Sequence, residues 1–360
     1  MERERKLSMT QLMALAWAGA MAPAAEVLPA AALPEGGHGA WLTGLFVLPL
    51  LLALGWLLGA AAGDGGLAQG LNSRLGPLAG GAVRILYMVW AAVLAAQRLG
   101  RCALRLSMTG SRDGSFWFFL AGLTAVSLWV ARGRLAALGR MGQGLLAGLL
   151  AAAGAVLLLS LPRLRWTLLF PARGTEVLAA AKAALPAAGA MAPALYAAFL
   201  LEQTDRERGG QTFLWWTVSG CLLLTAGQGI VLGCLGPVLA GRLGSPFFTL
   251  AQSVGVEGAF QRVESVIHTL WTGADLALTA LLIAAAGELG GHPPRISPAS
   301  ARMGAAAAAA VLAPPLAAAE GARGVRLWPV TLILSALPGL LTLIFDRRRG
   351  KTPGQSTSCV

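Results

Sequence analysis

Charged side chains are scarce in this chain. Asp, Glu, Lys and Arg make up 12% of its 360 residues, whereas about 25% is usual for a soluble domain. Hydrophobic residues make up 56%, and the mean hydropathy is +0.67. This composition excludes an ordinary soluble domain and indicates a chain that lies largely in lipid.

Cysteine and histidine are also rare, which bears on metal sites and disulfides. The chain contains only Cys102, Cys221, Cys234, Cys359, His38, His268 and His292. The cysteines show no paired spacing and the histidines are isolated from one another, so neither a disulfide framework nor a zinc site is indicated. We expect no metal and no cofactor.

Signatures of enzymes and of nucleic-acid binding are missing as well. No phosphate-binding loop, nucleophile elbow, zinc-protease motif or dinucleotide fingerprint occurs in a usable context, so we expect no enzyme. The net charge of +12 comes from Lys and Arg scattered between apolar runs and not gathered on one face. These residues are interpreted as topology signals, and no nucleic-acid partner is expected.

Long apolar runs dominate what is present. A membrane span needs about 20 mostly apolar residues, and about ten such runs can be placed. They cover 9–33, 40–62, 82–100, 115–131, 141–161, 183–203, 212–235, 260–286, 302–319 and 327–345. We predict an all-α integral membrane protein whose single membrane domain, 1–345, has halves at 1–174 and 175–345.

The distribution of positive charge predicts the orientation. The loop at 34–39 has no Lys or Arg, whereas the chain after residue 345 is strongly basic. Because cytoplasmic loops are enriched in Lys and Arg, we place both termini in the cytoplasm. The basic tail, 346–360, has no apolar period and is predicted to be disordered.

A repeated segment points to a binding site. Residues 18–24 recur letter for letter at 188–194, in the first span of each half. Gly and Pro both disfavour helix, so these copies predict broken helices in spans 1 and 6, a pattern that marks a site at the bilayer midplane. Chance is the alternative, because the chain is rich in Ala and Gly.

Two connections look structured. Residues 246–254 are too apolar for a solvated linker and too short to cross, and they predict a short amphipathic helix at the outer interface. Residues 66–79 place Leu67, Leu71, Leu75 and Leu78 at helical spacing, which predicts a helix on the cytoplasmic surface.

Several local patterns resemble one known family. Ser8 and Gln11 stand at the beginning of the first span, Pro29 lies near its end, and Pro246 leads a stretch that continues through Arg262, Glu264 and Trp271. In this order and spacing the chain is similar to the endospore germination permeases, the B subunits of GerA-type germinant receptors. That family is a branch of the amino acid, polyamine and organocation transporter superfamily.

This chain also departs from the family pattern. Where the family carries an acidic residue near the break of its sixth span, this chain has Ala190 to Pro193 and no acid. Where the family places a Lys in its eighth span, this chain has Asp275 and apolar neighbours. A family mechanism that depends on those charged groups is therefore in doubt here.

The resemblance implies a fold, a function and partners. It implies a LeuT-like 5+5 inverted repeat that holds its ligand between broken spans 1 and 6 and spans 3 and 8. It further implies a B subunit in the spore inner membrane that binds a small nutrient such as an amino acid and works with A and C subunits. Two alternatives stay open: an autonomous amino acid or amine transporter, including a proton-coupled one, and a structural scaffold.

The candidate ligand-binding residues come from the repeat and from spans 3 and 8. They are Gly19, Ala20, Met21, Ala22, Pro23, Ala24, Tyr87, Trp90, Gly189, Ala190, Met191, Ala192, Pro193, Trp271 and Asp275. Freed backbone groups at a break would bind the carboxylate and ammonium of a zwitterion. Packing is the alternative for Tyr87 and Trp90.

Charged and family-motif residues complete the set. Glu26 contacts a ligand or ion, or else forms a structural ion pair, because a carboxylate in a span is costly unless it is paired or faces water. Asp275 is a protonatable core group or bonds to a neighbouring helix. Gln11, Pro29, Arg262 and Glu264 are family-motif residues for which a structural role is expected.

Overall fold

The computed structural model describes residues 7–63, 66–109, 115–205, 209–243, 245–253, 263–291, 296–323 and 327–348. Almost all of them are helical. The long helices are α1 (Met9–Gly36), α2 (Thr43–Ala62), α3 (Leu67–Thr109), α4 (Phe116–Arg132), α5 (Leu135–Ser160), α6 (Gly174–Met191), α7 (Gly209–Leu235), α10 (Val263–Gly290), α11 (Pro298–Arg323) and α12 (Trp328–Arg348).

Short elements connect the long helices. Two are α-helices, α8 (Pro237–Arg242) and α9 (Pro246–Ser253). The 3-10 helices are η2 (Gly37–Leu42), η3 (Leu161–Arg163), η4 (Trp166–Leu168) and η5 (Ala192–Gln203), and two strands, β1 (Leu7–Ser8) and β2 (Thr204–Asp205), complete the order.

The helices match the ten predicted spans in order. Within the described residues, eight segments are long and apolar enough to cross a membrane, and α4 and α12 supply two shorter apolar helices. The sixth span consists of α6 followed by η5. The short helix predicted at 246–254 is confirmed as α9.

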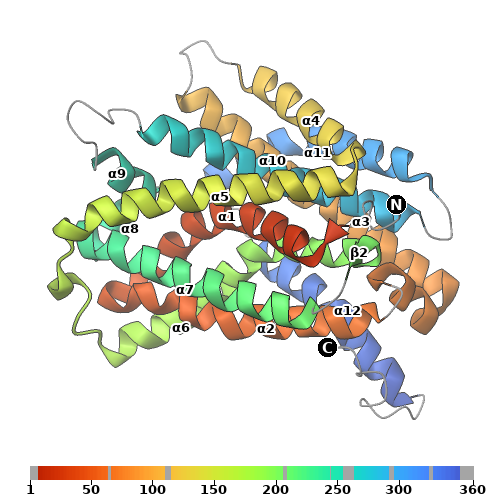
Figure 1. The fold of residues 1–360 in the computed structure, drawn as a ribbon, viewed down its shortest axis with the longest axis horizontal. Coiled ribbons are helices and arrows are strands. Elements are labelled where there is room, and N and C mark those ends of the chain that lie inside the picture. Colours follow the sequence, from red (N-terminus) through yellow and green to blue (C-terminus); the bar gives the residue numbers. More distant parts are fainter. Residues whose placement is uncertain are drawn as a thin grey trace.

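The two most buried spans lie in the middle of the bundle. In both α1 and α10, 78% of the most apolar window is buried, compared with 22% in α5 and α11. α1 packs against α5, α6, α7 and α10, while α3 packs against α4, α10 and α11. Figure 1 shows α1 between α5 and α7. Helices that are apolar all round and buried form the core of such a bundle.

The beginning of α1 is fixed to the end of the sixth span. β1 pairs in parallel with β2, with Leu7 opposite Thr204 and Ser8 opposite Asp205 (Figure 1). Ser8 caps α1: its hydroxyl accepts from the Gln11 N–H, and the Gln11 side chain accepts from the Ser8 N–H. This capping box satisfies two N–H groups at the helix start, so Gln11 has a structural role, as expected.

The predicted break in span 1 is wrong for this structure, because α1 runs without interruption from Met9 to Gly36. Pro23 has no N–H to donate to the Gly19 carbonyl, yet the helix continues. The reason is tight packing: a Cβ placed on Gly19 would lie 2.9 Å from the Leu278 Cβ of α10. Neighbouring helices thus hold α1 in place around its proline.

The second copy of the repeat does change helix type. The α-helix ends at Met191, and the chain continues as the 3-10 helix η5 with Pro193 in its first turn. A switch from α to 3-10 geometry changes which carbonyls receive hydrogen bonds. The expected interruption of span 6 is present in this form.

Two further boundaries differ from the prediction. The helix expected at 66–79 continues into the third span through a kink at Gly76, whose φ of 81° favours glycine. Leu67 and Leu71 are buried in the core while Leu78 is exposed. At the other end, α12 continues to Arg348, three residues into the predicted tail, and 349–360 lie outside the described residues.

Candidate ligand site

Three arginines share one face of α3. Arg98, Arg101 and Arg105 are three and four residues apart, a spacing that puts side chains on the same side of a helix. That face is directed toward Glu26 of α1 and Asp275 of α10. Five charged side chains therefore meet where three central helices come together.

The five groups form one ion-pair network. Arg105 donates to Glu26 at 2.9 Å and also donates to Asp275. Arg98 Nη1 lies 3.8 Å from a carboxylate oxygen of each acid. Arg101 Nη1 lies 3.4 Å from Glu26 Oε2. Two of the arginines thus bridge α1 to α10.

Burial of the network is graded. The side chains of Asp275 and Arg98 are 3% and 4% exposed, whereas those of Glu26 and Arg101 are 23% and 32% exposed. Buried charges are costly unless they are paired, and ionisable residues within membrane spans usually serve a function. The network runs from the protein interior to a partly accessible edge formed by Glu26 and Arg101.

The chemistry of this network suits a ligand with two opposite charges. Guanidinium groups bind carboxylates through parallel hydrogen bonds, and carboxylates accept from ammonium groups. Both kinds of partner stand within a few ångströms of each other here.

The three arginines were not recognised in the sequence. The apolar run of span 3 ends at residue 100, which places Arg101 and Arg105 beyond the predicted span, and the scattered Lys and Arg residues indicate only topology. α3 instead continues to Thr109. The signal that would have revealed them is their helical spacing between apolar residues such as Leu99, Ala103 and Leu106.

The two predicted acidic residues are found in the network. Of the two roles considered for Glu26, the structure shows ion pairing, with three arginines of α3. Asp275 is deeply buried and forms an ion pair with Arg105 of α3. Of its two predicted roles, the structure shows the bond to a neighbouring helix. Arg262 lies outside the described residues, and the side chain of Glu264 is not described either.

The small residues of the repeat lie in one core but do not face one cavity. The members that share a hydrophobic cluster are Ala18, Ala20, Ala24, Ala188, Met191 and Ala194. A Cβ on Gly189 would lie 2.7 Å from the Trp328 Cβ of α12, so this part of the second copy packs against α12. Pro23, Ala192 and Pro193 are buried, and Ala190 is half-buried. The repeat mainly allows close helix packing.

The predicted aromatic residues of α3 differ in their surroundings. The Tyr87 hydroxyl donates to the Leu334 carbonyl of α12 at 2.6 Å, and its ring packs against Tyr196 and Phe199 of η5. Trp90 is half-buried and packs against the core. Tyr87 thus connects α3 to η5 and α12.

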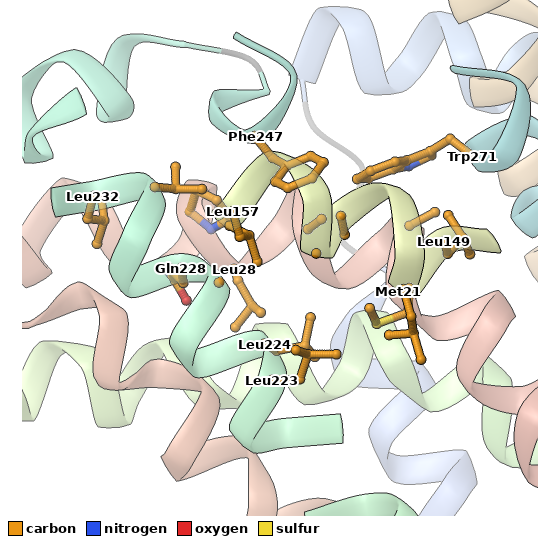
Figure 2. Close-up of a pocket in the computed structure, with 18 residues that line it drawn as sticks. Met21, Leu28, Leu149, Leu157, Leu223, Leu224, Gln228, Leu232, Phe247 and Trp271 are labelled. Atoms are coloured by element: carbon orange, nitrogen blue, oxygen red, sulfur yellow. The ribbon is translucent and has the colours of Figure 1, made fainter. Parts of the chain in front are cut away.

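A separate apolar pocket lies beside the network. Its walls come from α1, α5, α7, α9 and α10, and its cavity volume is about 100 Å³. Met21, Ala22, Pro29 and Trp271 are the predicted residues that line it; Figure 2 labels Met21 and Trp271. Ala22 and Glu26 are one helical turn apart, as are Trp271 and Asp275, so the pocket and the network adjoin along α1 and α10.

No grouping of His, Cys, Asp and Glu among the described residues could hold a metal ion.

Comparison with known proteins bears on the fold. No protein-family model and no curated protein matches the chain. Among solved structures, the crystal structure of MhsT in complex with L-phenylalanine is similar over 95% of this chain and 89% of that chain, with a TM-score of 0.68 and 15% sequence identity. The chain is a multi-pass membrane protein with the predicted LeuT-like helical fold.

Proposed function

We propose that this protein binds a zwitterionic amino acid among α1, α3 and α10, and that it acts as the B subunit of a spore germinant receptor. In this proposal it resides in the spore inner membrane with both termini in the cytoplasm. Binding is signalled to A and C subunits through a shift between two states of the helix bundle. The ion-pair network of Glu26, Arg98, Arg101, Arg105 and Asp275 is the observation that carries the proposal.

The network supports binding by exchange of ion pairs. The ligand carboxylate takes the place of Glu26 at an arginine, and the ligand ammonium binds the carboxylate released. Because charge pairs are replaced and not lost, the desolvation cost stays moderate. The exchange loosens the bridge between α1 and α3, so the ligand favours a state in which these helices are rearranged. A ligand can shift a conformational equilibrium only through such differential contacts.

Other features support the receptor role. Part of the stretch that carries the family resemblance packs together: Phe247 and Phe248 of α9 lie against Trp271, with ring centroids 5.7 and 4.7 Å from that of Trp271. Gln11 completes the capping box of α1, the helix that supplies Glu26. MhsT, which shares the fold, was crystallised with an amino acid, L-phenylalanine.

Germination of spores that carry Arg105→Gln tests the proposal. We expect the response to amino acids to be lost while the protein remains in the membrane, because Arg105 pairs with both acids. Arg163→Gln is the matched control, since Arg163 bonds the Ser253 carbonyl at an exposed position away from the network. An unchanged amino acid response in Arg105→Gln spores would remove the network from the mechanism.

The transporter alternative is favoured by the similarity to MhsT over nearly the whole chain. It predicts that the purified protein moves labelled amino acid into liposomes without other subunits. Saturable binding without flux supports the receptor subunit, whereas substrate flux supports the transporter.

A further inference from the structure

The apolar pocket contains polar groups that no protein atom satisfies. Gln228 of α7 is 6% exposed, and neither its amide oxygen nor its amide nitrogen has a hydrogen-bond partner. The indole N–H of Trp271, which is 5% exposed, is also without an acceptor. Figure 2 shows these two residues on opposite sides of the view.

Such groups are rare because they are costly. Each buried donor or acceptor without a partner costs about 1–3 kcal/mol. Buried polar groups are normally hydrogen-bonded, so an unpaired primary amide facing an empty pocket calls for a partner from outside the chain. A ligand that carries both a donor and an acceptor would satisfy Gln228.

The rest of the wall defines the body of that ligand. Apart from Gln228, the side chains that line the pocket are aliphatic, aromatic or methionine, and none is charged. A zwitterion or an ion placed here would lose its hydration without a countercharge, which is costly. The pocket therefore suits an apolar body with an uncharged head and does not suit the proposed amino acid.

The surroundings indicate how the ligand enters. Leu150 of α5 and Leu223 of α7 line the pocket and are 39% and 40% exposed, so the opening lies between two helices with apolar outer faces. Gly154, also on α5, has open space where its Cβ would be. Because outward-facing apolar side chains of membrane spans contact acyl chains, we expect this opening to face the bilayer.

We propose that this pocket binds a single-chain amphiphile with an uncharged hydrogen-bonding head, such as a long-chain primary alcohol, which enters from the bilayer between α5 and α7. The hydroxyl donates to the Gln228 amide oxygen and accepts from its amide nitrogen. The chain lies along Leu149, Leu157 and Phe247. This site is distinct from the ion-pair network and does not depend on the proposed receptor function.

Photolabelling tests the site directly. The full-length protein in phospholipid nanodiscs is irradiated with hexadecanol that carries a diazirine, and the labelled peptides are mapped by mass spectrometry. We expect labels on α1, α5 and α7 around the pocket. Excess hexadecanol should compete at least tenfold more effectively than hexadecanoate, since only the alcohol has an uncharged head.

Two variants of α5 distinguish labelling by a ligand bound in the pocket from labelling by surrounding lipid. Gly154→Leu places a side chain in the pocket and should abolish the competed labelling. Gly144→Leu is the control, because Gly144 also lies on α5 with open space at its Cβ but does not line the pocket. Gln228→Leu keeps the apolar volume and should weaken competition by the alcohol about tenfold, the loss expected for one hydrogen bond of about 1.4 kcal/mol.

Three results would overturn the proposal. They are labelling that excess alcohol does not displace, labelling that survives in Gly154→Leu, and equal competition by hexadecanoate. The first would show contact with bulk lipid only, and the last would show that the head group is not recognised.

Discussion

The strongest physical constraint at the level of single residues is the buried charge of Asp275. Asp275 is 3% exposed in the centre of the bundle and interacts with two arginines of α3. Removal of one member of a buried ion pair leaves a charge without compensation, which is far more costly than the pair itself is stabilising. The same carboxylate is therefore predicted to matter both for stability and for ligand binding.

Asp275→Asn should strongly destabilise the protein. We expect a loss of about 3–5 kcal/mol, the range for breaking a buried ion pair. The loss of stability is measured by thermal unfolding of the purified variant and of wild type, monitored through tryptophan fluorescence. Glu35→Gln, at an exposed position of α1, should change stability by no more than about 0.5 kcal/mol. Equal melting temperatures for wild type and Asp275→Asn would contradict the assignment.

Asp275 and Glu26 could be singled out from the sequence because charges within apolar runs stand out. Hydropathy alone does not single out their arginine partners, since the end of a span is hard to place when the apolar run ends before the helix does. α3 extends nine residues beyond the predicted end at residue 100, and those residues contain Arg101 and Arg105. Side-chain spacing, and not hydropathy, identifies them.

At the scale of helices, α1 shows how tertiary packing can override a local signal. Gly19 and Pro23 both disfavour helix, and a break was predicted from them. Packing against α10 keeps α1 continuous instead. In the second copy, where Gly189 packs against α12, the helix changes to 3-10 geometry at Ala192. Identical sequences thus adopt different local structures because their neighbours differ.

Gly19→Leu should disrupt the contact between α1 and α10. A Cβ at Gly19 would lie 2.9 Å from Leu278, closer than side-chain atoms normally approach. We expect a loss of about 1–3 kcal/mol from overpacking, measured by thermal unfolding. Gly59→Leu is the control on α2, because its Cβ would meet open space. Similar unfolding temperatures for the two variants would show that α1 and α10 are less closely packed than the structure indicates.

Pro23→Ala should stabilise α1 and weaken ligand binding. Alanine restores the N–H that bonds the Gly19 carbonyl, and a proline within a helix costs about 3 kcal/mol relative to alanine. We expect a higher melting temperature together with a lower affinity for the amino acid, since α1 rearranges on binding in our proposal and a more stable α1 opposes that change. Pro49→Ala, inside α2, should raise stability without changing affinity. A Pro23→Ala variant that binds as tightly as wild type would show that α1 need not rearrange.

At the scale of the whole molecule, composition and apolar runs predict an all-α membrane protein of about ten spans, and the family resemblance implies the LeuT-like arrangement of those spans. All ten predicted spans correspond to helices in the same order, and the overall arrangement resembles that of MhsT. The apolar pocket could not be foreseen, because it depends on which faces of α1, α5, α7, α9 and α10 meet around Gln228. The ligand site depends on which faces of α1, α3 and α10 meet, which hydropathy does not report.

The central claim is that a ligand with two opposite charges enters the network of Glu26, Asp275 and the three arginines of α3. Binding of labelled amino acids to the purified protein in nanodiscs tests it most directly, with the amide and the N-acetyl derivative of each bound amino acid as competitors. We predict saturable binding of at least one amino acid, and competition at least tenfold weaker from either derivative because each has lost one charge. Competition by both derivatives as strong as that of the parent amino acid, or no saturable binding by the folded protein, would contradict the account.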